Sequence, residues 1–88
     1  MKTSVYTAHY DALRKWLKMN REAQGLSLRD VSALWGRHHS VLGKIEQSRR
    51  KVELVEFIEL CSILEADPHE GLSLLQKSLS GTNNKTRT

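Results

Sequence analysis

The side chains best suited to specific chemistry lie in one stretch, residues 35–51, with the sequence WGRHHSVLGKIEQSRRK. It combines imidazole, hydroxyl, amide and cationic groups, all of which donate hydrogen bonds to phosphates or base edges. Residues 37–51 hold five Lys or Arg and one acid, whereas residues 52–70 hold six acids and no Lys or Arg. A basic face of this kind is the expected footprint of a nucleic-acid-binding surface. The alternative is a charged run that serves only as a solvated face.

These residues lack the partners that catalysis or metal binding would require. His38 and His39 have no neighbouring acid or nucleophile that would complete a hydrolytic site. On a helix the two rings would point in different directions, and no CxxC or HxxxH spacing occurs in the chain. The single cysteine, Cys61, falls on an apolar stripe and is expected to be a small core residue. We therefore expect no enzyme activity, no metal and no cofactor.

Length and composition predict one small globular domain. A chain of 88 residues buries little more than about 60% of its unfolded surface, which leaves no room for two cores. The apolar fraction of 39% and the charged fraction of 27% are those of an ordinary globular protein. No apolar run approaches the roughly 18 residues that span a bilayer, and the start, MKTSVYTAHY, lacks the apolar core of a secretion signal. We expect a cytoplasmic protein with no membrane partner and no evident small-molecule ligand.

Apolar periodicity predicts a compact, all-α domain of five helices over residues 8–79. Residues 1–7 are expected to form a loose N-terminal arm. Residues 80–88 are polar and aperiodic, and are expected to form a disordered tail. The first helix is predicted over residues 8–24, and Gly25 can end it in the left-handed conformation.

Two short helices follow, separated by a glycine. Ser27 caps the first of them, and Gly36 ends it after about two turns. The second runs from His38 or His39 to Gln47, with an apolar inner side and a polar outer side. Because such short helices are marginal alone, packing against the rest of the domain has to hold them.

The fourth and fifth helices complete the domain. The fourth is predicted over residues 53–65, and the acids expected on its outer side are Glu53, Glu56 and Glu59. Its predicted inner stripe consists of Leu54, Phe57, Ile58, Cys61 and Leu64. Asp67-Pro68 is a start signal for the fifth helix, since Asp caps and Pro is pre-set for the first helical position. On this helix the expected dimer interface consists of Leu72, Leu75 and Leu79, and burial within the monomer is the competing interpretation.

Two short helices joined by a glycine turn, the second with a free polar side, have the geometry of a helix-turn-helix. The residues GLSLRDVSALWGRHHSVLGKIEQSRRKVELVEFIELCSILEADP resemble the Cro/CI-type, or Xre-family, helix-turn-helix regulators, which have a lambda-repressor-like DNA-binding domain. The resemblance covers residues 13–75. Its most specific parts are Gly25-Leu26-Ser27, Gly36, Ile45-Glu46 and the apolar spacing from Leu54 to Leu64.

This resemblance assigns roles to residues at matching positions. It implies that His39, Ser40 and Lys44 read base edges in the major groove of double-stranded DNA. The residues that it places at the DNA backbone are Ser27, Arg29, Arg37, Gln47, Arg49 and Arg50. Leu28 stands where the family often has a polar residue, so Arg29 or the main chain is expected to make that phosphate contact.

Departures from the family pattern concern the recognition helix. Arg21 and Glu46 match a pair that bridges the first and third helices, and two independent surface charges are the alternative. His38 replaces the usual Ser or Thr cap, where packing or a hydrogen bond within the turn is favoured over base reading. Gly43 costs about 1 kcal/mol relative to alanine, so the helix is expected to be weakly ordered until DNA holds it. Ser48 replaces the usual glycine after the helix, which leaves the exit turn open.

The resulting hypothesis is a sequence-specific transcriptional regulator, in its simplest form a homodimeric repressor on a pseudo-palindromic operator. A dimer is expected because one recognition helix reads too few base pairs to specify an address. The alternative, from another class, is an antitoxin or phage-type adaptor. Its acidic fourth helix would bind a basic protein partner, and DNA binding would be secondary.

Overall fold

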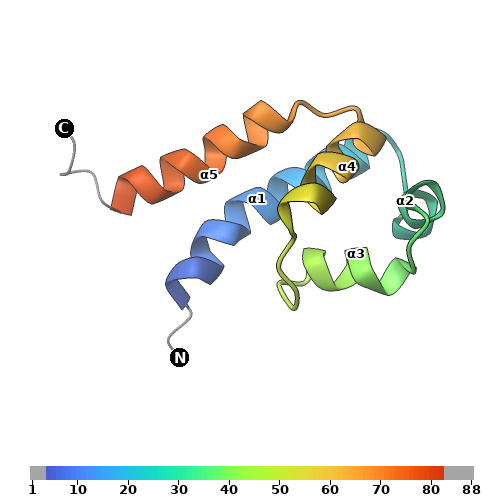
Figure 1. Ribbon diagram of the computed structural model, residues 1–88, viewed down its shortest axis with the longest axis horizontal. Coiled ribbons are helices and arrows are strands. Elements are labelled where there is room, and N and C mark those ends of the chain that lie inside the picture. The colour runs from blue at the N-terminus through green and yellow to red at the C-terminus, as the bar shows by residue number, and fades with distance from the viewer. Residues whose placement is uncertain (1–3, 83–88) are drawn as a thin grey trace.

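The computed structural model describes residues 4–82, and their side chains over residues 8–80. Within that range the helices are α1 (Ser4–Ala23), α2 (Leu28–Trp35), α3 (His39–Glu46), α4 (Leu54–Leu64) and α5 (Pro68–Thr82). α1 and α5 lie side by side, and α2, α3 and α4 gather at the C-terminal end of α1 (Figure 1). The all-α prediction of five helices is confirmed. None of the helices among the described residues combines the length and apolar character needed to span a membrane.

The ends of α2 follow from local sequence signals. The Ser27 hydroxyl accepts from the Asp30 N–H at 3.0 Å, and the Asp30 carboxylate accepts from the Ser27 N–H at 2.8 Å. This reciprocal capping box satisfies two N–H groups that the first turn would otherwise leave free. Gly36 then ends the helix in the left-handed conformation, with φ of 78°. Both ends lie where they were predicted.

The helices extend past two predicted boundaries. α1 already includes residues 4–7 of the expected arm, and α5 includes residues 80–82 of the expected tail. The remaining parts of the arm and tail, residues 1–3 and 83–88, lie outside the described residues. α1 and α5 pack against each other, which stabilises both helices relative to isolated ones.

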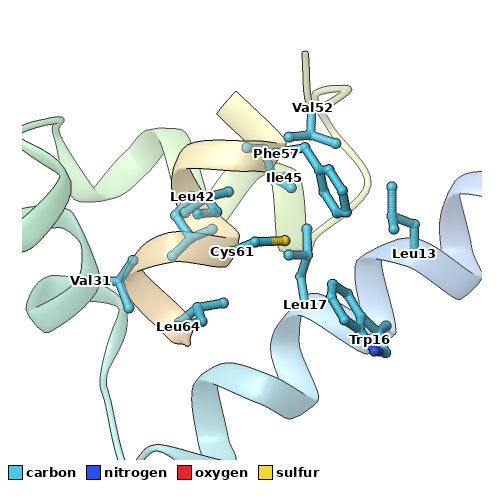
Figure 2. Close-up of a cluster of buried hydrophobic side chains, with 11 residues drawn as sticks. Leu13, Trp16, Leu17, Val31, Leu42, Ile45, Val52, Phe57, Cys61 and Leu64 are labelled. Atoms are coloured by element: carbon cyan, nitrogen blue, oxygen red, sulfur yellow. The ribbon is translucent and has the colours of Figure 1, made fainter. Parts of the chain in front are cut away.

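The hydrophobic core lies where the helices meet (Figure 2). Its buried side chains are Leu13, Trp16, Leu17, Val31, Leu42, Ile45, Val52, Phe57, Leu60, Cys61 and Leu64. The rings of Trp16 and Phe57 lie 6.0 Å apart between centroids. α5 covers these rings at Gly71, which is itself buried. Every helix from α1 to α4 thus contributes to one core, which fixes α2 and α3 on the other elements.

The inner face of α4 differs from the prediction. Leu54 and Ile58, which were expected to be buried, are 66% and 46% exposed, whereas Leu60 is fully buried. Glu56, which was expected to face outward, is only 2% exposed. The predicted and observed stripes both have helical spacing, so periodicity alone does not separate them. Glu56 can be buried on the observed inner side because Arg37 and Arg50 donate hydrogen bonds to its carboxylate.

Candidate nucleic-acid interface

α3 has one buried side and one free side. Leu42 and Ile45, on the inner side, are 2% and 3% exposed. The residues predicted to read bases, His39, Ser40 and Lys44, are all exposed. The structure therefore brings these three side chains to the solvent side of one short helix whose other side is anchored in the core.

His38 caps the start of α3. Its Nδ1 accepts from the Ser40 N–H at 3.1 Å and lies 2.9 Å from the Ser40 hydroxyl. This is the hydrogen bond within the turn that was favoured for His38, so the helix start is capped despite the missing Ser or Thr. The rings of His38 and His39 stack with centroids 4.4 Å apart. The prediction that they point apart was wrong, because His38 has an extended backbone before the helix begins.

The predicted bridge between α1 and α3 is present. The Arg21 guanidinium donates from Nε and Nη2 to the two carboxylate oxygens of Glu46, at 2.7 and 3.0 Å. These hydrogen bonds raise the pKa of Arg21 above its usual value. Arg14 donates to the main-chain oxygen of Glu46 at 2.7 Å. Two arginines of α1 thus hold the C-terminal end of α3, and the paired geometry restricts its rotation.

Ser48 forms the turn after α3, whose conformation was not predicted from the sequence. It adopts φ of 63°, the left-handed conformation that glycine usually supplies. The Ser48 N–H donates to the Ile45 carbonyl at 3.2 Å, and the Arg49 N–H donates to the Lys44 carbonyl at 2.8 Å. These two hydrogen bonds make a Schellman motif, which ends α3 and leads the chain into residues 48–51, the basic loop.

Five of the six residues predicted at the DNA backbone are exposed: Ser27, Arg29, Arg37, Gln47 and Arg49. Ser27 and Arg29 lie at the start of α2, where the helix dipole favours an anion. Gln47 and Arg49 lie at the end of α3, and an Arg49 Nη1 to Gln47 Oε1 distance of 3.4 Å links them. Side chains at both ends of the helix-turn-helix are therefore accessible to phosphates.

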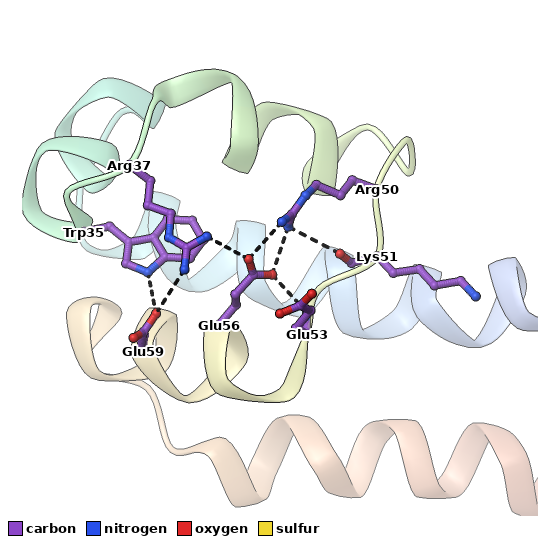
Figure 3. A network of polar contacts seen from close by, with 7 residues as sticks. All are labelled: Trp35, Arg37, Arg50, Lys51, Glu53, Glu56 and Glu59. Atoms are coloured by element: carbon purple, nitrogen blue, oxygen red, sulfur yellow. Dashed lines mark hydrogen bonds and ion pairs between the residues drawn. The ribbon is translucent and has the colours of Figure 1, made fainter.

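Two of the predicted backbone contacts, the exposed Arg37 and the half-buried Arg50, are held by Glu56 (Figure 3). Arg50 donates from Nη1 and Nη2 to the two carboxylate oxygens at 2.8 and 2.9 Å, and Arg37 donates to one of them at 3.0 Å. The Glu53 N–H donates to the same carboxylate at 3.0 Å. The hydrogen bond from Arg50 is the main cause that lowers the pKa of Glu56 to about 2. Sequence reasoning missed this residue, although an acid three positions after a helix cap is a recognisable signal.

An aromatic contact extends this cluster to the turn between α2 and α3. The Trp35 indole donates to Glu59 at 2.9 Å, and the Arg37 guanidinium lies 4.8 Å above the centre of the Trp35 ring. Arg37 also lies 4.0 Å from Glu59. Hydrogen bonds and opposite charges thus join the turn to α4, and the cation–π contact holds Arg37 against Trp35.

A hollow of about 200 Å³ opens beside the basic loop. Its lining residues are Tyr10, Arg14, Leu17, Ile45, Ser48, Arg49, Arg50, Lys51 and Val52. Small-molecule pockets usually range from about 300 to 1,000 Å³, so this hollow is below the usual size. The exposed surface around α3 is therefore the stronger candidate for function.

Comparison with known proteins agrees with this geometry. A family model described as a helix-turn-helix domain matches residues 12–74. The structure of an XRE-family like protein from Pseudomonas syringae pv. tomato is similar with a TM-score of 0.77 and 31% identity, over 85% of this chain and 92% of that chain. The restriction-modification controller protein C.AhdI from Aeromonas hydrophila gives a TM-score of 0.67 and 31% identity, over 73% of this chain and 97% of that chain. No curated protein gives a significant match. The chain belongs to the helix-turn-helix family of DNA-binding regulators, in its Xre group.

Proposed function

We propose that this protein is a homodimeric transcriptional repressor that reads a pseudo-palindromic site in double-stranded DNA with α3. The observation that carries the proposal is the free polar side of α3, where His39, Ser40 and Lys44 are exposed opposite a buried apolar side. A helix with its side chains is about 10–12 Å across, which fits a major groove about 12 Å wide. Each paired contact to a base would contribute about 1–3 kcal/mol of discrimination between sequences.

Phosphate contacts from the same surface would supply attraction that does not depend on sequence. Ser27 and Arg29 would act at the start of α2, and Gln47 and Arg49 at the end of α3, where all four are exposed. Because such contacts release counterions, affinity for any duplex should fall as salt rises. The likeness to a restriction-modification controller protein supports a regulatory role for this surface.

The two-fold arrangement would place two copies of α3 about 34 Å apart, one helical turn of DNA. On α5, Leu72 and Leu79 are 39% and 43% exposed, and Leu75 is half-buried, so this surface is available to a second copy. α4 offers a second apolar surface that the sequence did not predict. Its exposed large apolar residues are Leu54, Val55 and Ile58. Of the two surfaces, α5 remains the proposed dimer interface. Charged substitutions on α5 and on α4 distinguish the two.

Selection from a random duplex library, followed by footprinting of the enriched site, tests this proposal. We expect two related half-sites separated by about one helical turn. Lys44→Ala should relax the preference at one base step and leave affinity for random DNA nearly unchanged. Lys77→Ala is the matched control, because this exposed lysine lies on α5, away from α3 (Figure 1). An equal loss of affinity for every sequence in Lys44→Ala would remove Lys44 from base reading.

A protein-interaction adaptor is the second candidate, and α4 is the observation that favours it. This helix exposes Glu59 beside the apolar side chains of Val55 and Ile58, a combination suited to a protein partner with cationic and apolar side chains. A library selection that enriches no sequence would favour this function. Enrichment of a defined site would make DNA reading the primary one.

A further inference from the structure

One buried carboxylate holds the chain on both sides of α3. Arg37 lies just before this helix and Arg50 just after it. Both donate to Glu56, whose side chain is 2% exposed, at 3.0 and 2.8 Å. Figure 3 shows the Glu56 carboxylate between the two guanidinium groups, with α4 below and α3 above. The entrance and the exit of α3 are therefore tied to the same point on α4.

Within this cluster the positive charges are balanced by acids. Arg50 is paired with Glu56 through two hydrogen bonds, and Arg37, whose side chain is 40% exposed, contacts both Glu56 and Glu59. A guanidinium that is already neutralised by a carboxylate adds little to the counterion release that drives phosphate binding. Arg49, the neighbour of Arg50 in sequence, is exposed and is linked to an uncharged amide oxygen at 3.4 Å. Adjacent arginines in the same loop thus differ in how much charge they can offer to DNA.

We propose that Glu56 is a positioning residue for base reading, which fixes α3 on α4 through Arg37 and Arg50 and withholds both cations from DNA phosphates. This inference rests on the proposed function, and it removes Arg37 and Arg50 from the phosphate contacts that the family resemblance implied. A rotation of α3 would displace all of its base-reading side chains together, so anchoring both ends preserves discrimination between sequences. Glu46, which α1 holds separately, secures the same helix from another direction.

The two neighbouring arginines provide a matched test. The dependence of affinity on salt is measured with a random duplex for Arg49→Gln and Arg50→Gln. Arg49→Gln should reduce the slope of log K against log salt by about 1, because it removes one phosphate contact. Arg50→Gln should leave that slope unchanged but lower the preference for the selected site over random DNA by at least about fivefold. An equal reduction of the slope by both variants would overturn the proposal.

Glu56→Gln tests the carboxylate itself, with Glu65→Gln as the control. Both changes remove one negative charge from the region of α4, but Glu65 is exposed at the end of the helix. Glu56→Gln should release the arginines, so the salt slope should steepen by about 1 to 2 and the preference for the selected site should fall. Glu65→Gln should retain the preference of the wild type. A Glu56→Gln protein that folds and keeps both the slope and the preference of the wild type would contradict the proposal.

Amide hydrogen exchange makes the test independent of DNA. In Glu56→Gln, the amides of α3 should exchange faster than in Glu65→Gln, whereas those of α1 should change little. Unchanged exchange in α3 would show that Glu56 does not fix this helix on α4, even if the protein binds DNA. If the wild type binds no duplex, the proposed function fails, and hydrogen exchange still decides whether Glu56 holds α3. If Glu56→Gln does not fold, the slope and site preference of Arg50→Gln decide the proposal.

Discussion

Gly43 lies on α3 beside residues proposed to read bases, yet it faces the protein. It is buried, and a methyl group at this position would lie 4.0 Å from the Leu28 Cδ1 atom, an ordinary contact. Gly43→Ala should therefore raise the free energy of unfolding by about 1 kcal/mol, the difference in helix propensity. Affinity for the selected site should not fall, since the methyl group points toward α2. Urea unfolding measures the stability, and a duplex titration measures the affinity. A loss of stability would show that the site has no room for the methyl group.

Glu56 predicts how stability depends on acid pH. Its pKa is about 2 in the folded protein and 4.5 ordinarily, so the folded state favours the charged carboxylate. The stabilisation is complete above the unfolded pKa and is lost as the pH falls from about 4.5 to about 2. A shift of this size corresponds to about 3 kcal/mol. Urea unfolding between pH 2 and pH 6 should show a steep loss of stability in the wild type.

Glu56→Gln should flatten this dependence, and Glu65→Gln should retain it. The pKa values of Asp11, Asp30 and Asp67 are also lowered by hydrogen bonds, and these carboxyls remain in both variants. Their contribution therefore cancels in the comparison. A dependence in Glu56→Gln as steep as that of the wild type would assign the acid sensitivity to those other carboxyls.

The same residues show how far single positions could be predicted. The Arg21–Glu46 bridge followed from a matching family pattern, and the structure contains it. Glu56 was placed on the outer side of the helix from apolar periodicity, which contains no information about a buried ion pair. Its hydrogen bond from the Glu53 N–H follows a local capping pattern. Its arginine partners lie in the turn before α3 and the loop after it, and no local pattern revealed those contacts. His38 was recognised as part of the turn, but its stacking on His39 depended on backbone angles that the sequence does not display.

At the scale of elements, the packing of α5 on α1 and α4 depends on Gly71. A methyl group there would lie 2.8 Å from the Trp16 ring and 2.9 Å from the Phe57 ring, both of which are buried in the core. Gly71→Ala should force α5 outward at an overpacking cost of about 1–3 kcal/mol, which exceeds the gain of about 1 kcal/mol in helix propensity. A net loss of about 1 kcal/mol is expected in urea unfolding. Gly43→Ala is the control, because the same change there is expected to raise the free energy of unfolding. A Gly71→Ala protein more stable than the wild type would refute the close contact at Gly71.

Helix starts and stops were predictable where a short motif sets them. The Ser27–Asp30 capping box, the left-handed Gly36 and the Asp67-Pro68 start are all local signals, and each has the predicted effect. The outer ends of α1 and α5 were not predictable in this way. α1 and α5 come from opposite ends of the chain and pack against each other, which is a tertiary effect that local motifs do not encode.

At the scale of the whole molecule, the charge pattern in the sequence overstates the cations available to DNA. Residues 37–51 carry five Lys or Arg, and the next segment carries six acids. Folding brings these segments together, so that Arg37 and Arg50 face Glu56 rather than solvent alone. Part of the positive charge of the basic segment is therefore paired with the acidic segment inside the domain. Lys44 on α3, and Arg49 and Lys51 in the loop that follows it, are exposed cations.

Dimerisation decides whether two copies of this surface can act on one site. Leu72→Lys would introduce a charge on α5, where the leucine is 39% exposed, and Ile58→Lys would do so on α4, where the isoleucine is 46% exposed. If α5 forms the interface, Leu72→Lys should shift the protein to a monomer in sedimentation equilibrium and Ile58→Lys should not. Affinity for a two-half-site duplex should then fall by about a hundredfold or more, because linked binding is lost.

Affinity for a single half-site should change little in Leu72→Lys, since α3 is intact in each monomer. The reverse result, with only Ile58→Lys monomeric, would place the interface on α4. A wild type that remains monomeric on its two-half-site duplex would refute the dimer altogether. One α3 would then have to supply all of the discrimination, and the few base pairs that it can reach would limit the protein to weak, degenerate sites.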